Sequence, residues 1–275
     1  MNNKPKFFVV FRACDAITSF NGSPRPFGLS KTELVKICFL SLYESLLPYE
    51  HEIVVLGDKL SKDLEDFFLK SKVTLIQGNW GNEASLQKAF DLGYSQPSAD
   101  WVYFCEDDYL HSKDAFHHIT DLISNKKEIL YHKPRGFFQR PFSTDFSTLP
   151  LVIHPTDYPD RYLYFRRKKS FVFLGNTCHW RQISNTTFTF LLEKETLKRY
   201  FDTFNRSIKG ANDGYLSSKL YGQSFFYGKS LCLSPIPGIA SHMHIDTISP
   251  LVKWKKRIDE IEKVQLLGNL SIEKS

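Results

Sequence analysis

Three consecutive carboxylates, Glu106, Asp107 and Asp108, follow an apolar segment in the stretch WVYFCEDDYL. Neighbouring like charges repel and resist removal from water, so this cluster needs a compensating cation or exposure to solvent. Carboxylate oxygens suit Mg²⁺ or Mn²⁺, and an ion held by them keeps positions open for diphosphate oxygens. The alternative is a solvated strand end that caps the next helix.

Two histidines, His242 and His244, alternate in the segment SHMHID near the other end of the chain. In an extended backbone, residues two apart point to the same side, and a neutral imidazole is a common metal ligand. We expect one of the two to complete the coordination of an ion held by Asp108. The alternative is a pair of ordinary surface or core histidines.

Other charged residues lie at the ends of apolar segments or at the start of a helix. Arg12 and Asp58 follow the first and second apolar segments. Asp213 falls in the first turn of a predicted helix capped by Asn212. A carboxylate there can serve as a general base or simply favour the helix dipole.

The elements that must position these residues alternate regularly in the first 110 residues. Apolar runs typical of strands buried on both faces occur at 7–11, 52–57, 73–77 and 101–106. Amphipathic helices are predicted between them, the first with a capping box of Ser30 and Glu33. Such crossovers produce a parallel sheet covered on both faces, which binds ligands beyond the carboxyl ends of its strands.

The second half of the sequence is less regular. Strands are predicted at 128–132, 162–165, 171–174 and 186–192, and a helix near 194–204. The tail predicts an amphipathic helix with Pro250 at its first position and a stripe of Leu251, Trp254, Ile258 and Ile261. Lysines around Trp254 suit a weak contact with an anionic membrane, although the more usual arrangement packs the stripe on the core.

Composition bounds the class of protein. The 275 residues are 42% hydrophobic, which is ample for a core, and the formal charge of +6 favours anionic partners without choosing among them. Five scattered cysteines without a Cys-x-x-Cys pair argue against a disulfide framework and for a reducing compartment. With no segment resembling a signal or a membrane span, a cytoplasmic protein is expected.

The order of these motifs resembles the nucleotide-sugar half of the GT-A glycosyltransferases, especially the family-two-like group. In that group one strand ends in an acidic residue, the next is followed by Asn-x-Gly, and a later strand ends in Asp-x-Asp. The matching residues here are Asp58, Asn79 with Gly81, and Glu106 with Asp108. The resemblance covers residues 5–110 and, more loosely, 186–246.

The resemblance implies an α/β, GT-A (Rossmann-like) fold with a mixed, mainly parallel sheet and helices on both faces. It implies a single domain over residues 1–275. Within it, residues 1–110 would bind the nucleotide sugar, 111–248 would form the acceptor side, and 249–275 would be a C-terminal helix and tail.

The resemblance also implies an activity, that of a metal-dependent, inverting hexosyl- or pentosyltransferase. The donor would be a nucleotide diphosphate sugar and the acceptor a hydroxyl of a glycan or glycoconjugate. Mn²⁺ or Mg²⁺ would be held by Asp108 with His242 or His244, and Asp213, although preceded by Asn212 instead of the usual Glu, would be the catalytic base. The residues expected to contact the nucleotide sugar are Arg12, Asp58, Gln87, Glu106 and Asp107.

Three rival functions remain at this stage. A nucleotidyltransferase would use a similar acidic metal site, but the sequence FRACDAITSFNG lacks the glycine-rich basic loop that normally follows the first strand. A non-catalytic nucleic-acid-binding module would interleave lysines and aromatics along one surface, whereas here they are dispersed, so no nucleic-acid partner is expected. A sugar-binding relative without activity is the third.

Overall fold

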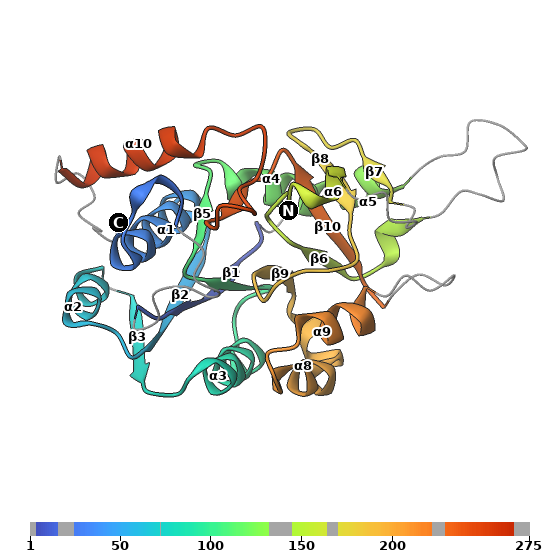
Figure 1. Cartoon of the computed structure of the whole chain (residues 1–275). Helices are drawn as coiled ribbons and strands as arrows, with labels where there is room; N and C mark the ends of the chain where they lie inside the picture. The colour runs from blue at the N-terminus through green and yellow to red at the C-terminus, as the bar shows by residue number, and fades with distance from the viewer. Residues whose placement is uncertain are drawn as a thin grey trace, which may run out of the picture.

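The computed structural model describes residues 4–15, 25–71, 73–131, 145–163, 170–221 and 229–266. Their main feature is a nine-stranded sheet with the strand order β3-β2-β1-β4-β9-β6-β10-β8-β7 (Figure 1). A separate two-stranded sheet pairs β11 with β5. The order places the first four strands of the chain together on one side of the large sheet.

This side of the sheet is parallel and built from the regular part of the sequence. Its strands are β1 (Phe7–Ala13), β2 (His51–Asp58), β3 (Thr74–Gly78) and β4 (Trp101–Glu106). The crossovers contain α1 (Lys31–Leu46), α2 (Lys62–Lys70) and α3 (Asn82–Ser95). The four predicted strands and the helices between them are therefore confirmed.

The predicted capping box fixes the start of α1. The Ser30 hydroxyl accepts from the Glu33 N–H at 3.2 Å, and the Glu33 carboxylate accepts from the Ser30 N–H at 2.8 Å. A cap of this kind is worth about 1 kcal/mol. Because it defines the first turn, it also fixes the position of Lys31 beside the acidic motif.

The other side of the sheet is mixed. Its strands are β6 (Leu151–Ile153), β7 (Val172–Phe173), β8 (His179–Gln182), β9 (Phe190–Glu193) and β10 (Leu231–Ile236). β9 runs antiparallel between β4 and β6, whereas β10 is parallel to β6 and antiparallel to β8. The small sheet consists of β5 (Tyr109–His111) and β11 (Ala240–His242).

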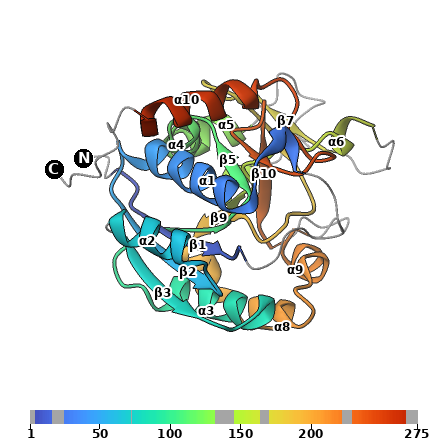
Figure 2. The same ribbon diagram turned by 60° about the vertical axis from the view of Figure 1, so that its left-hand side comes forward.

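Helices cover both faces of the large sheet. Those of the second half are α4 (Ala115–Ser124), α5 (Lys126–Leu130), α6 (Asp160–Leu163), α7 (Lys194–Arg199), α8 (Phe201–Ile208), α9 (Asp213–Leu220) and α10 (Trp254–Leu266), with 3-10 turns η1 (Pro26–Gly28) and η3 (Phe146–Thr148). α1, α2 and α10 lie above the sheet, and α3, α8 and α9 lie below it (Figures 1 and 2).

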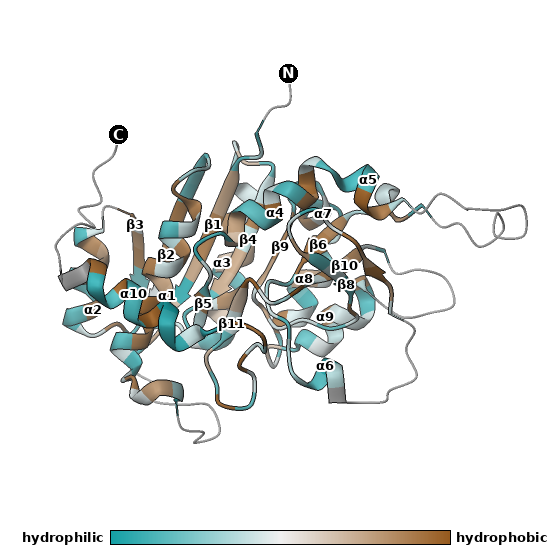
Figure 3. Ribbon diagram, turned by 90° about the horizontal axis from the view of Figure 1, so that it is seen from above, coloured by the Kyte–Doolittle hydropathy of each residue, from teal (hydrophilic) through white to brown (hydrophobic). Residues whose placement is uncertain are grey.

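Alternate residues of a strand serve the two faces. Phe7, Val9 and Phe11 belong to one buried cluster with α1, and Phe8 and Val10 to the other with α3. The strands accordingly appear hydrophobic along their length in Figure 3, and the outer helical surfaces appear polar. The predicted fold class, a mainly parallel sheet with helices on both faces, is confirmed.

Two predicted strands are wrong. Residues 126–130 form α5, in which the Ile129 N–H donates to the Asn125 carbonyl at 2.9 Å. The side chains of Ile129 and Leu130 are both buried. Residues 160–163 form α6, while 164 and 165 lie outside the described residues. Apolar and aromatic composition favoured strands, but tertiary packing decided otherwise. The strand predicted at 171–174 is present as β7.

Three predicted boundaries also differ. β9 begins at Phe190 instead of residue 186, because the N–H groups of Glu106 and Thr189 donate to threonine hydroxyls there, at 3.0 and 3.3 Å, and not to strand carbonyls. The helix predicted over 194–204 is divided at Tyr200 into α7 and α8. The last helix begins at Trp254, not Pro250, since Leu251 adopts a left-handed φ of 70°.

The last helix packs its apolar stripe on the core. Trp254, Ile258 and Ile261 are buried, whereas Leu251 is 77% exposed. Arg257 is buried as well, and donates to the His111 carbonyl of β5 at 3.0 Å. The weak membrane contact predicted for this helix stays a prediction. In the described part of the chain, no helix combines the length and apolarity that a membrane span requires.

Candidate active site

Parallel register brings the ends of four strands to one edge of the sheet. Arg12 at the end of β1 lies opposite Glu106 at the end of β4. On its other side β1 runs alongside β2, which ends at Asp58, the partner of Gly78 in β3. The predicted placement of the charged residues at a common edge is therefore confirmed, and the acidic motif begins where β4 ends.

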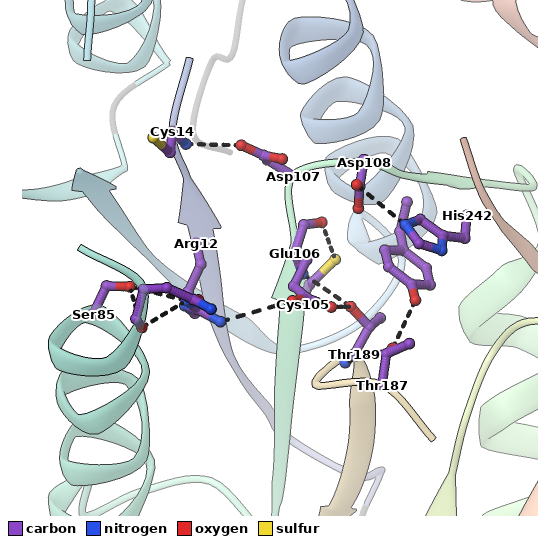
Figure 4. A network of polar contacts seen from close by, with 12 residues as sticks. Arg12, Cys14, Ser85, Cys105, Glu106, Asp107, Asp108, Thr187, Thr189 and His242 are labelled. Atoms are coloured by element: carbon purple, nitrogen blue, oxygen red, sulfur yellow. Dashed lines mark hydrogen bonds and ion pairs between the residues drawn. The ribbon is translucent and has the colours of Figure 1, made fainter. Parts of the chain in front are cut away.

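Asp108 and the two histidines come together beyond this edge. Oδ2 of Asp108 lies 3.2 Å from Nε2 of His242 and 3.3 Å from Nε2 of His244. β5 and β11 pair antiparallel with His242 opposite Tyr109, and the Met243 N–H donates to the Asp108 carbonyl at 2.8 Å. Figure 4 shows the Asp108 carboxylate facing the His242 ring.

This cluster fits a divalent cation. Asp108, His242 and His244 each offer one ligand atom, and these atoms lie within 4.8 Å of one another. Oδ1 of Asp108 is buried and has no hydrogen-bond partner among the described residues. Such an atom calls for a ligand, because an unpaired buried carboxylate oxygen is costly. Imidazole nitrogens beside a carboxylate suit Mn²⁺ and later transition ions better than Mg²⁺.

Electrostatics hold these groups together without an ion. Burial raises the pKa of Asp108, but His242 and His244 outweigh it and bring that pKa well below its usual value. Burial lowers the pKa of His242, but the facing Asp108 carboxylate raises it further, so the net shift is upward. In the ion-free cluster the Asp108 carboxylate thus favours the protonated form of His242, and a metal ion would take the place of the proton on Nε2.

Asp107 points away from the histidines. Its Oδ2 accepts from the Cys14 N–H at 2.7 Å, and its Oδ1 forms an ion pair with Lys31 (Figure 4 shows the Cys14 contact). Both side chains of the ion pair are mostly buried, and burial raises the pKa of Asp107 despite the opposing effect of Lys31. Asp107 therefore joins the ends of β1 and β4 to the first turn of α1.

Glu106 faces Arg12 and Thr189. Its Oε1 lies 3.8 Å from Nη1 of Arg12, and its Oε2 accepts from the Thr189 hydroxyl at 3.3 Å. Burial raises the pKa of Glu106, while Arg12 opposes that shift. Three consecutive carboxylates are thus tolerated because each faces a different cation: Glu106 faces Arg12, Asp107 faces Lys31, and Asp108 faces the histidines.

Arg12 is held by α3 through one of its guanidinium nitrogens. Its Nη2 donates to the Asn82 carbonyl at 3.1 Å and to the Ser85 hydroxyl at 2.9 Å. Its Nε and Nη1 are buried and make no hydrogen bond among the described residues. A guanidinium with unused N–H groups at a strand end is suited to an anionic oxygen.

Asp58 and Gln87 are engaged by the protein itself. The Asp58 carboxylate accepts from the N–H groups of Trp80 and Gly81 at 2.6 and 2.9 Å, which shapes the turn before α3. The Gln87 amide donates to Asp91 at 3.0 Å and to Asn205 at 3.1 Å, and so ties α3 to α8. Their predicted contact with a nucleotide stays a prediction.

Asp213 begins α9, as predicted, with Asn212 as the cap. Burial raises the pKa of its carboxyl group. α9 is tied to the site through Ser217, whose hydroxyl accepts from the Thr186 N–H at 3.1 Å. The next residue, Thr187, lies 2.7 Å from the Tyr109 hydroxyl. This places α9 beside the segment that borders the cluster.

Sequence reasoning missed Lys31 and Tyr158. Lys31 carried a usable signal, because a cation in the first turn of a helix opposes the helix dipole and so calls for an acidic partner. Tyr158, which lies 3.4 Å from His242 through its hydroxyl, carried none. It belongs to an irregular segment whose place depends on distant contacts.

Comparisons with known proteins concern the fold. No family model matches the chain, and no curated protein matches its sequence. Its structure is similar to that of the galactosyltransferase LgtC in complex with donor and acceptor sugar analogues (TM-score 0.44, 11% identity, covering 96% of this chain and 100% of that chain). It is also similar to CMP:2-keto-3-deoxy-manno-octonic acid synthetase complexed with CTP (0.44, 15%, 94% and 99%). A third is 4-diphosphocytidyl-2C-methyl-D-erythritol synthase from Anaerococcus prevotii (0.43, 10%, 96% and 100%).

Proposed function

We propose that this protein is a metal-dependent glycosyltransferase that moves a sugar from a nucleotide diphosphate donor to a hydroxyl of a glycan or glycoconjugate. The observation that carries the proposal is the convergence of Asp108, His242 and His244 beyond the carboxyl end of β4. That edge of an open α/β sheet is where such folds bind their ligands.

The donor side of the site favours an anion. Asp108, His242 and His244 would hold the ion, which would supply electrostatic stabilisation of the leaving diphosphate. Arg12 offers unused N–H groups at the end of the neighbouring strand, so it binds diphosphate or phosphate-linked oxygen. Glu106 orients Arg12, and Asp107 fixes the end of β1 through the Cys14 N–H.

The nucleoside is assigned to the ends of β1 and β2. Asp58 shapes the turn at Trp80 and Gly81 there, which gives the base and ribose a fixed wall. Gln87, held between α3 and α8, is the further residue to which we assign a contact with the nucleotide.

The acceptor side carries the base. We assign to Asp213 the removal of the proton from the attacking hydroxyl, and the raised pKa of this carboxyl group suits that task because it increases basicity. Attack on the anomeric carbon from the face opposite the diphosphate inverts the configuration.

The decisive experiment measures both donor binding and the product released. Nucleotide diphosphate sugars are screened with Mn²⁺ or Mg²⁺ by thermal shift, and the hits are assayed for release of the nucleoside diphosphate. The variant Asp108→Asn should lose the metal-dependent stabilisation, whereas Asp63→Asn, which changes an exposed carboxylate on α2, should keep it.

Two outcomes would count against the proposal. The absence of any metal-dependent stabilisation by these donors would refute it. Release of pyrophosphate from a nucleoside triphosphate and a sugar phosphate would instead identify a nucleotidyltransferase.

A further inference from the structure

We propose that Tyr158 is a positioning residue of the metal centre, whose hydroxyl oxygen accepts the Nδ1–H of His242 and thereby presents Nε2 of that ring to the ion. The inference rests on the proposed function only insofar as Asp108, His242 and His244 hold a divalent cation. It concerns how the chain orients one of those ligands toward the ion.

The geometry separates the two nitrogens of His242. Nε2 lies 3.2 Å from the Asp108 carboxylate, and Nδ1 lies 3.4 Å from the Tyr158 hydroxyl. A neutral imidazole carries one N–H, so binding of metal at Nε2 requires the proton to be on Nδ1. Metal-bound histidines usually donate their other N–H to an oxygen that fixes the tautomer and ring orientation. Tyr158 is in the position of that oxygen.

The neighbouring hydroxyls give this network one consistent direction. If Tyr158 accepts from His242, its own O–H must donate elsewhere, and the Tyr109 hydroxyl lies 2.9 Å away. Tyr109 can then donate to the Thr187 hydroxyl oxygen at 2.7 Å. The chain of donors therefore runs from His242 through Tyr158 and Tyr109 to Thr187.

The rings themselves are held in place. The Tyr109 ring stacks on the His242 ring at a centroid distance of 4.8 Å and an interplanar angle of 3°. The Arg161 guanidinium lies over the Tyr158 ring, 5.1 Å from its centroid, and the His154 ring lies 5.3 Å away on centroids. Burial raises the pKa of Tyr158, so its hydroxyl keeps the proton that it donates to Tyr109.

A purely structural role for the Tyr158 hydroxyl predicts something different. In that case its removal would lower the stability of the fold and leave the His242 tautomer and the metal affinity unchanged. The two roles are separated by measuring metal binding, tautomer and stability on the same variants.

The test compares Tyr158→Phe with the wild-type chain. Mn²⁺ affinity is measured by calorimetry and by electron paramagnetic resonance, and thermal stability is measured in the presence of a chelator. We expect Tyr158→Phe to bind Mn²⁺ about 10- to 100-fold more weakly, which is the usual effect of losing a partner of a metal-bound histidine. The matched control Tyr162→Phe, which removes a hydroxyl that contacts Asp157, should bind Mn²⁺ like the wild type.

A second measurement does not depend on activity. Nitrogen-15 correlation spectra of the protein loaded with diamagnetic Zn²⁺ should show His242 as the Nδ1–H tautomer in the wild type and as a mixture of tautomers in Tyr158→Phe. Unchanged Mn²⁺ affinity or an unchanged tautomer in Tyr158→Phe would overturn this inference and leave the proposed function standing. If the wild type binds no divalent ion, both fall.

Discussion

The two halves of the molecule build one site in different ways. In the half before His111, the parallel register of β1 and β4 delivers Arg12 and the acidic motif to one edge of the sheet. In the later half, His242 and Tyr158 arrive on a short strand and an irregular segment, each placed by contacts with distant parts of the chain.

The difference shows what each half can do alone. Glu106 and Asp107 have cationic partners, Arg12 and Lys31, within the first half. Among the described residues, the side chain of Asp108 forms hydrogen bonds only with His242 and His244 of the second half. Regular secondary structure therefore fixes the carboxylates, and long-range pairing brings one of them to two histidines.

The variant Asp108→Asn should have the largest effect, because it removes the carboxylate that meets both histidines. We expect Mn²⁺ binding to be lost and transfer to fall by about 10³-fold or more, since a metal ion supplies several kcal/mol and about 1.4 kcal/mol corresponds to a factor of ten. Circular dichroism should show an intact fold. Retained Mn²⁺ binding in this variant would place the ion elsewhere.

The variant Lys31→Met removes an ion pair that lies entirely within the first half. It leaves Asp107 buried opposite no cation from α1, so the free energy of unfolding should fall by about 3 kcal/mol, as for other broken buried ion pairs. The double variant Lys31→Met, Asp107→Asn should recover part of that loss in urea denaturation. If Lys31→Met were as stable as the wild type, the pair would not hold β4 to α1.

Asp213→Asn affects the second half alone. We expect turnover to fall by about 10²-fold, the lower end for a lost general base, because the acceptor hydroxyl would keep its proton. Mn²⁺ and donor affinity should not change, since they depend on Asp108, the two histidines and Arg12. Equal losses in donor affinity and turnover would remove Asp213 from the role of base.

The smallest expected effect is a pH dependence of the metal-free protein. The pKa of Asp108 is lowered on folding, so its contribution is present above the unfolded value and is lost only in strong acid. The pKa of His242 is raised on folding, so its contribution is complete below the unfolded value of about 6.5 and is lost as pH rises through the higher folded value.

Chelator-treated protein should therefore lose stability as pH rises from the unfolded value of about 6.5 through the higher folded value. His242→Gln should abolish this loss, as measured by urea denaturation across that range. Affinity for Mn²⁺ should rise over the same interval, because the ion competes with the proton on Nε2. Parallel trends with and without Mn²⁺ would contradict the pairing of these groups.

The sequence predicted the first half better than the second, for physical reasons. Strands buried on both faces and caps such as Ser30 are local patterns, so β1 and α1 could be read directly. Asp108 and His242 could be assigned because residue type and spacing signal metal chemistry. Lys31 was not singled out, although its charge at a helix start was a clue.

The second half was harder to predict, because contacts between residues far apart in the sequence determine its structure. α5 occupies a segment whose apolar residues suggested a strand, and burial of Ile129 and Leu130 in the core accompanies a helix instead. The role proposed for Tyr158 depends on its contact with His242, which is 84 positions away in the sequence. No local pattern carries such information.

The pairing of β5 with β11 has a consequence for how the protein matures during synthesis. Asp108 leaves the ribosome 134 residues ahead of His242 in a chain of 275, so its carboxylate exists for about half of translation without the two histidines. The proposed capture of an ion would therefore be a late event, which follows the emergence of nearly the whole polypeptide. A nascent chain stalled before β11 could build the parallel sheet and would still lack the centre that the sheet presents.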